Sequence, residues 1–252
     1  MPSSPEADLF HDPPPVSVEN EAGASAILLL CEHASRFVPD AYRGLGLAEA
    51  DLARHIAWDI GAADLARALS RRLDATLVLG GYSRLLVDCN RPLTSPTLMP
   101  VVSETTRIPG NEGIDDAERT RRIEGIFAPF QAAVADRLDA RAEAGRRSVV
   151  IGVHSFTPVF KGVARPWHAG VLYGRAEAFG ERLLAALGGP SPTLAANEPY
   201  RVDEEDHTVP VHGDARGLDA ILLEIRNDLI SSDDGVRAWA DRLAPALAQA
   251  VA

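Results

Sequence analysis

The sequence contains little cysteine and no long apolar run. Only Cys31 and Cys89 occur among its 252 residues. Two cysteines so far apart provide neither a disulfide framework nor a CxxC metal knuckle, so we expect reduced thiols in a cytoplasmic protein. No apolar stretch approaches the roughly 18–20 residues that cross a bilayer. Residues 1–22 are acidic and proline-rich, unlike a signal peptide, and predict an extended N-terminal arm.

Basic residues are also fewer than acidic residues. The chain carries 36 acidic and 25 basic residues, for a formal net charge of -11. A negatively charged protein repels phosphate backbones and anionic lipids, which argues against nucleic acid and membranes as partners. A small anionic substrate remains compatible with this charge, because a local arginine cluster outweighs the distant field. The composition is equally compatible with a homo-oligomer.

Several catalytic motifs are missing. No GxGxxG or GxxxxGK[ST] pattern occurs, so nothing in the sequence supports nucleotide binding. Ser155 follows a predicted strand but lacks the GxSxG elbow of a serine hydrolase. The chemistry must therefore come from other residues.

What the sequence does have is an alternation of apolar runs with helical spacing, and 46% of its residues are hydrophobic. This pattern predicts an α/β layered fold, with residues 23–252 as one domain. The predicted strands are residues 25–31, 75–79, 84–88, 148–153, 169–173 and 220–225. The predicted helices are residues 49–73, 115–144 with a kink at Pro129, 176–187, and a last helix capped by Ser232. Residues 94–113 and 195–217 are predicted as long loops.

Polar side chains lie at the carboxyl ends of four of these predicted strands. They are Glu32-His33, Asp88-Cys89-Asn90-Arg91, His154-Ser155 and Glu224-Ile225-Arg226. In open α/β sheets, ligands bind beyond the carboxyl ends of the strands. Charged residues are rarely buried without partners, so this convergence predicts a metal site, an ion-pair network, or both.

His33 and His154 are the predicted ligands of a divalent metal, and zinc is the metal we expect because imidazole suits it. The third ligand is open between two residues. Asp59 lies on the first predicted helix and is slightly favoured, and Glu32 is the alternative. Glu32 is adjacent to His33, and successive residues of an extended strand face opposite ways. The competing interpretation makes both histidines hydrogen-bonded structural residues.

Glu224 is the candidate general base, since a carboxylate beside a metal-bound water can accept its proton. The alternative is a structural pair with Arg226, two residues further along the same strand face. Asn90 and Arg91 are predicted to bind a substrate carboxylate through a planar fork of donors. Arg91 could instead tie down a neighbouring loop or pair with Asp88.

Three further residues are weaker candidates for binding the substrate. Arg226 or Arg84 could hold a second carboxylate. His212, with Tyr200, lies in the polar loop before the last predicted strand and could close over the site.

Six segments together resemble the N-formylglutamate amidohydrolase family, in the order in which the family has them. They are CEHAS (31–35), HIAWDIGA (55–62), SRLLVDCNRP (83–92), IPGN (108–111), HSFTP (154–158) and LLEIRNDLI (222–230). The resemblance implies a three-layer α/β/α sandwich of the phosphorylase/hydrolase-like kind with a mixed, mostly parallel central sheet. It also implies hydrolysis of N-formyl-L-glutamate to formate and L-glutamate, a late step of one histidine degradation route.

A more distant likeness is to zinc carboxypeptidases. In those enzymes an Asn-Arg pair binds the substrate carboxylate, a His-Ser provides a zinc ligand, and a glutamate two residues before an arginine is the base. Asn90-Arg91, His154-Ser155 and Glu224-Ile225-Arg226 match that plan. The carboxypeptidases have a glutamate three residues after their first histidine, whereas Arg36 stands there in this sequence.

Two rivals to the family's reaction follow. One is a carboxypeptidase or deacylase that acts on a larger N-acyl amino acid or peptide. The other is a non-catalytic protein that binds a small carboxylate in the same pocket. The base candidate Glu224 argues against the second. Within the family, the CEHAS opening differs from the Pro-His-Ser-Gly typical of members closer to the degradative enzyme.

Overall fold

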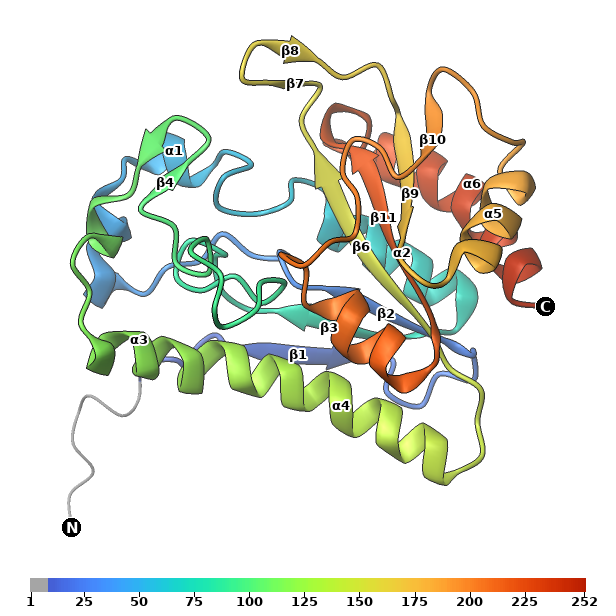
Figure 1. The fold of residues 1–252 in the computed structure, drawn as a ribbon, viewed down its shortest axis with the longest axis horizontal. Helices are drawn as coiled ribbons and strands as arrows, with labels where there is room; N and C mark the ends of the chain where they lie inside the picture. The colour runs from blue at the N-terminus through green and yellow to red at the C-terminus, as the bar shows by residue number, and fades with distance from the viewer. Residues whose placement is uncertain (1–8) are drawn as a thin grey trace.

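A computed structural model describes residues 9–252, and its centre is a seven-stranded sheet in the order β1-β3-β2-β6-β11-β9-β10 (Figure 1). The strands are β1 (Val16–Glu19), β2 (Ile27–Cys31), β3 (Thr76–Gly80), β6 (Val149–Phe156), β9 (Ala169–Tyr173), β10 (Leu194–Ala196) and β11 (Asp219–Arg226). Strands β3, β2, β6 and β11 run parallel to one another, and β1, β9 and β10 run opposite to them. The sheet is therefore mixed and mostly parallel.

Helices cover both faces of this sheet. The helices α2 (Ala62–Leu73), α5 (Glu177–Ala186) and α6 (Asp233–Val251) pack on one face, and α4 (Ala128–Glu143) lies on the other with η5 (Val209–Gly213) (Figure 1). Because successive strand residues point to opposite faces, Leu29 enters the first core and Leu28 and Leu30 the second. Strands buried on both faces are continuously apolar. The predicted three-layer α/β/α fold is confirmed.

The remaining elements are short. They are η2 (Asp40–Gly46), α1 (Glu49–Leu52), β4 (Val102–Ser103), β5 (Thr106–Arg107), η3 (Pro109–Asn111), α3 (Asp116–Arg122), η4 (Ile123–Phe127), β7 (Val159–Phe160), β8 (Val163–Ala164), η6 (Asp214–Arg216) and η7 (Asn227–Leu229). Two hairpins, β4–β5 and β7–β8, stand outside the central sheet. Among residues 9–252, no helix has both the length and the apolar character of a membrane span.

The predicted strand at residues 84–88 is wrong: this segment is a buried turn. Ser83 Oγ accepts a hydrogen bond from the backbone N–H of Leu85 at 3.2 Å, and the backbone N–H of Leu86 donates to Ser83 O at 3.0 Å. A serine that bonds its own backbone competes with sheet pairing. Leu85, Leu86 and Val87 are nevertheless buried. The apolar run therefore indicated burial but not a strand.

Two predicted helices are interrupted. Residues 53–61 between α1 and α2 are irregular and end at Gly61, whose φ of 79° favours glycine. Asp59 lies in this irregular segment and not on a helix. Between α3 and α4 the chain widens into the π-helical turn η4, just before Pro129. Proline lacks the N–H of a regular helical bond, which explains the distortion there.

The N-terminal arm joins the sheet. Residues 16–19 form the edge strand β1, antiparallel to β3. The first eight residues of the predicted arm lie outside the described residues, so the arm as a whole stays a prediction.

Candidate active site

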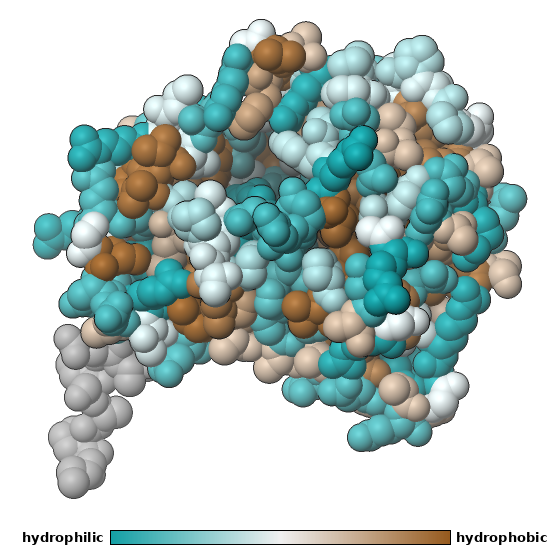
Figure 2. Space-filling view, in the orientation of Figure 1, coloured by the Kyte–Doolittle hydropathy of each residue, from teal (hydrophilic) through white to brown (hydrophobic). Residues whose placement is uncertain are grey.

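A cavity of about 580 Å³ opens near the ends of β2, β6 and β11. Figure 2 shows a recess with hydrophilic residues at its floor in the upper middle of the molecule. Seven of the predicted site residues line the cavity, among them His33, Asp59, His154, Asn90 and Arg91. Glu224 and Arg84 line it as well. Side chains from segments far apart in the sequence thus meet at one edge of the sheet.

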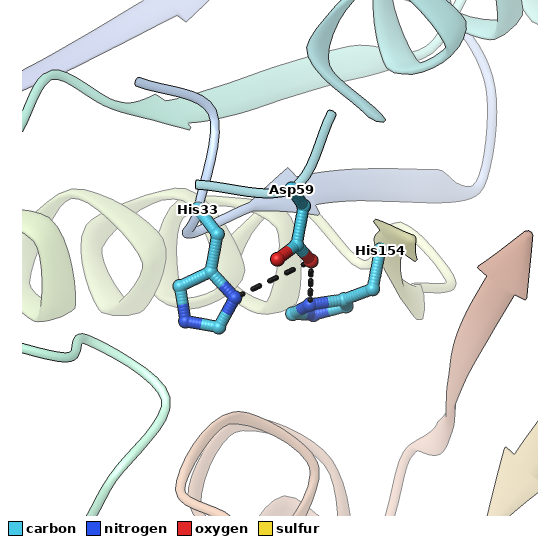
Figure 3. A group of neighbouring side chains, drawn as sticks. All are labelled: His33, Asp59 and His154. Carbon is cyan, nitrogen blue, oxygen red and sulfur yellow. Dashed lines mark hydrogen bonds and ion pairs between the residues drawn. The ribbon is translucent and has the colours of Figure 1, made fainter. Parts of the chain in front are cut away.

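His33, Asp59 and His154 form a buried group (Figure 3). Asp59 Oδ2 lies 3.4 Å from His33 Nδ1 and 3.0 Å from His154 Nδ1. One potential ligand atom of each residue lies within 4.8 Å of the other two. Two imidazole nitrogens and a carboxylate oxygen are a donor set typical of catalytic zinc, which keeps a further position for water or substrate.

Local backbone contacts fix this group. His33 follows β2, and its carbonyl accepts the backbone N–H of Asp59 at 3.0 Å. His154 lies on β6, and the backbone N–H of the next residue, Ser155, donates to Asp59 Oδ2 at 3.2 Å. Ser155 Oγ donates to Ile60 O at 2.9 Å. The irregular segment before α2 is therefore bonded to both strands that carry the histidines.

The second nitrogen of each imidazole faces another carboxylate. His33 Nε2 lies 2.7 Å from Asp88 Oδ1, and His154 Nε2 lies 3.2 Å from Glu32 Oε2. Metal-binding histidines are commonly oriented by such carboxylates. Asp59, and not Glu32, therefore shares the Nδ1 side of both rings. Sequence reasoning placed Asp88 at this edge but considered it only as a possible partner of Arg91.

The carboxylates and imidazoles of this site shift the pKa values of one another. Burial alone would raise the pKa of Glu32, but the neighbouring His154 lowers it to about 2. The pKa of Asp59 is likewise lowered, against burial, by His33 and His154. Burial and Arg84 act to lower the pKa of His33, yet Asp88 and Asp59 raise it. Carboxylates that hold positive charge on imidazoles would also favour a cation at the same place. The residues present therefore fit a divalent metal.

Glu224 lies beside this group. In the parallel ladder of β11 and β6 it is the register partner of His154, so the two side chains share one face of the sheet. Only 7% of Glu224 is exposed, and among residues 9–252 its Oε2 has no hydrogen-bond partner. Burial raises its pKa to about 7. The alternative pairing with Arg226 does not form, because the Arg226 guanidinium contacts Asp228, with Nε 2.8 Å from Oδ1.

Asn90 and Arg91 hold the loop before η5. Asn90 Nδ2 donates to Asp206 Oδ1 at 3.1 Å, and Arg91 Nη1 lies 3.4 Å from the same oxygen. Arg91 Nη1 also donates to Glu205 O at 2.7 Å. Asn90 Oδ1 accepts the backbone N–H of Thr208 at 2.9 Å. The pair thus contacts a carboxylate of the chain itself.

The remaining predicted binding residues lie in different places. Arg84 lines the cavity but is paired with Asp88, with Nη2 2.6 Å from Oδ2. Tyr200 also lines it. His212 and Arg226 lie outside the cavity lining, and His212 Nε2 contacts Gln131 Oε1 at 2.6 Å. We therefore leave His212 and Arg226 out of the candidate site.

A layered α/β domain with titratable groups gathered in a cavity at its sheet edge has the features of an enzyme active site. Residues 25–231 match the family model described as N-formylglutamate amidohydrolase, and the chain belongs to that family. It is therefore an amidohydrolase. No curated protein matches the chain.

Solved structures agree with this fold. A gene product of Agrobacterium tumefaciens is 42% identical, with a TM-score of 0.91 over 94% of both chains. The N-formylglutamate amidohydrolase of Ralstonia eutropha is 19% identical, with a TM-score of 0.66 over 94% of this chain and 97% of its own. A metallo-carboxypeptidase of Burkholderia cenocepacia, at 13% identity and a TM-score of 0.35 over 94% of this chain and 59% of its own, is too distant to support an argument.

Proposed function

We propose that the protein catalyses metal-dependent hydrolysis of the amide bond of a small N-acyl amino acid. N-formyl-L-glutamate, cleaved to formate and L-glutamate, is the substrate that the family indicates. The observation that carries the proposal is the buried His33–Asp59–His154 group with Glu224 as its neighbour.

His33 and His154, through Nδ1, and Asp59, through Oδ2, would hold the cation. A divalent metal bound there would polarise the amide carbonyl and lower the pKa of a water molecule. Glu32 and Asp88 would orient the two imidazoles from their other nitrogen atoms. This division of roles makes Asp59 the third ligand and Glu32 a positioning residue.

Glu224 would move the proton. Its carboxylate accepts a proton from the attacking water, whose oxygen bonds to the acyl carbon. The carbon–nitrogen bond then breaks, and Glu224 delivers the proton to the leaving amine. A buried carboxyl whose pKa lies near 7 is suited to both steps.

Asn90 and Arg91 would bind the substrate carboxylate. Their contact with Asp206 supports this role, because that oxygen is a carboxylate at the cavity wall. In the absence of substrate, Asp206 would occupy the position that the substrate carboxylate takes. With N-formyl-L-glutamate as substrate, the enzyme would act in the cytoplasm, late in histidine degradation.

Metal analysis of the purified protein, combined with a formate-release assay, tests this function. We expect stoichiometric zinc or a similar divalent metal, formate release from N-formyl-L-glutamate, and loss of turnover after chelation with recovery on adding metal back. Turnover that persists in the fully chelated protein would overturn metal dependence. Metal binding without hydrolysis of any N-acyl amino acid would favour the non-catalytic binding protein.

A further inference from the structure

One wall of the cavity is aromatic. It consists of Phe156 at the end of β6, Phe160 in β7 and Tyr200 after β10, and all three line the cavity. Arg165 lies outside the lining and contacts all three rings, with its guanidinium carbon 5.9, 4.5 and 4.7 Å from their respective centroids. Its Nη1 also donates to Tyr200 Oη at 2.8 Å. Arg165 therefore fixes the three rings as one surface, which we call the aromatic wall.

The apolar surface continues toward Glu224. Leu172 of β9 and Leu222 of β11 are register partners, and both line the cavity. Leu222 lies two residues before Glu224 on the same strand face. An apolar group that extends from a reacting carbonyl near Glu224 would therefore contact these leucines.

Exposed valines lie on two hairpins beside the cavity. Val102 at the start of β4 is 53% exposed, and Val159 and Val163 of the β7–β8 hairpin are 52% and 68% exposed. The backbone N–H of Lys161, in the turn of that hairpin, lies 3.5 Å from Glu104 Oε1 in the turn after β4. Two hairpins with exposed valines thus meet beside the cavity. Apolar side chains gathered on a surface commonly mark a binding site.

Sheet topology places this surface beside the two histidines. In the order β3-β2-β6-β11-β9, the strands that carry Leu222 and Leu172 follow directly after β6, which carries His154. Asn90 and Arg91 are bonded to Glu205 and Asp206 in the segment that follows Tyr200. The carboxylate-binding pair, the leucines and the aromatic wall therefore line one cavity.

We infer that the preferred substrates carry a bulky apolar acyl group, aryl or arylalkyl, that packs on the aromatic wall. This inference rests on the proposed function and specifies its substrate class. A cavity of about 580 Å³ has the size of pockets that enclose drug-sized ligands. A formyl group has a single carbon and would leave the aromatic wall without contact. Aromatic rings gain most from packing against other rings.

The test keeps the amine constant and varies the acyl group: N-formyl-, N-acetyl- and N-phenylacetyl-L-glutamate. We expect kcat/KM to be at least about tenfold higher for the phenylacetyl than for the formyl compound. Phe160→Ala should lower this ratio about tenfold. The matched control Phe37→Ala removes a partly exposed ring outside the cavity lining and should leave the ratio within about twofold. A preference for the formyl compound, or an unchanged ratio in Phe160→Ala, would overturn the inference.

Calorimetry distinguishes failure of the inference from failure of the proposed function. Absence of hydrolysis for every compound refutes the proposed function. The inference is then decided by binding of N-phenylacetyl-L-glutamate to the wild type and to Phe160→Ala. At least about tenfold weaker binding to the variant supports it. Equal binding, or no binding to either protein, refutes it.

Discussion

At the scale of single residues, the proposed mechanism depends on which carboxylate is a metal ligand, which orient the imidazoles and which transfers protons. Four carboxylates surround two imidazoles, and the position of each carboxylate indicates its role. Asp59 lies on the Nδ1 side of both rings, Asp88 and Glu32 contact the Nε2 atoms, and Glu224 stands on the neighbouring strand. Only Glu224 combines burial with an unpaired oxygen and a raised pKa. It is therefore the carboxylate best placed to exchange protons.

Glu224→Gln tests this assignment. The amide has the same shape but cannot accept a proton, so kcat should fall by about 10²–10⁴-fold while metal content stays at the wild-type level. The comparison needs kinetics and elemental analysis on the same preparations. Loss of metal or of folding in the variant would instead identify Glu224 as a ligand or a structural residue.

His212 should make stability depend on pH. Burial and the nearby His207 lower the pKa of His212 to about 4. The unfolded chain, with a histidine pKa of about 6.5, then binds more protons than the folded one between these values. The stabilisation that comes from the lowered pKa of His212 is therefore fully present above pH 6.5. As pH drops toward 4, it is lost, and the free energy of unfolding falls by up to about 3 kcal/mol.

His212→Asn removes the titrating ring and should flatten that part of the pH profile. Urea unfolding of both proteins at several pH values between 4 and 7 measures the effect. Parallel profiles for wild type and variant would show that His212 does not have the lowered pKa.

At the scale of elements, we expect the loop before η5 to compete with the substrate. Asp206 contacts Asn90 and Arg91, the residues that would bind a substrate carboxylate. Burial raises the pKa of Asp206, which shows that its surroundings penalise its charge. A substrate that binds to Asn90 and Arg91 would therefore have to displace this carboxylate.

Asp206→Asn weakens the internal contact and should lower KM by about two- to tenfold, because a neutral amide competes less well for the arginine. Glu204→Gln removes the same charge from an exposed position in the same loop and should leave KM within about twofold. Steady-state kinetics of the wild type, Asp206→Asn and Glu204→Gln measure these changes in KM. A higher KM in Asp206→Asn would mean that Asp206 supports the substrate and does not compete with it.

The elements also show what the sequence could and could not predict. Continuous apolar runs correctly predicted the four central parallel strands, because a strand buried on both faces needs no polar alternation. The same signal failed at residues 84–88, where the Ser83 hydroxyl accepts the backbone N–H of Leu85 and the chain forms a turn. The helix predicted through Asp59 failed because residues 53–61 bend to bring that carboxylate between two strands.

At the scale of the whole molecule, the site depends on contacts that local sequence patterns do not encode. The strand-end motifs predicted that His33, His154 and Glu224 would converge, and all three line one cavity. The choice between Asp59 and Glu32 required the position of an irregular segment relative to β2 and β6. The aromatic wall joins residues from β6, β7 and the segment after β10, which no single motif connects.

The central claim is that His33, Asp59 and His154 hold one divalent cation. Its most direct test is the metal content of the wild type and of Asp59→Asn, each purified in the presence of zinc and then dialysed. We predict one equivalent of zinc per wild-type chain and a near-complete loss in Asp59→Asn, since a carboxylate ligand becomes a neutral amide. A wild type without bound metal, or an Asp59→Asn variant that retains a full equivalent, would contradict the account.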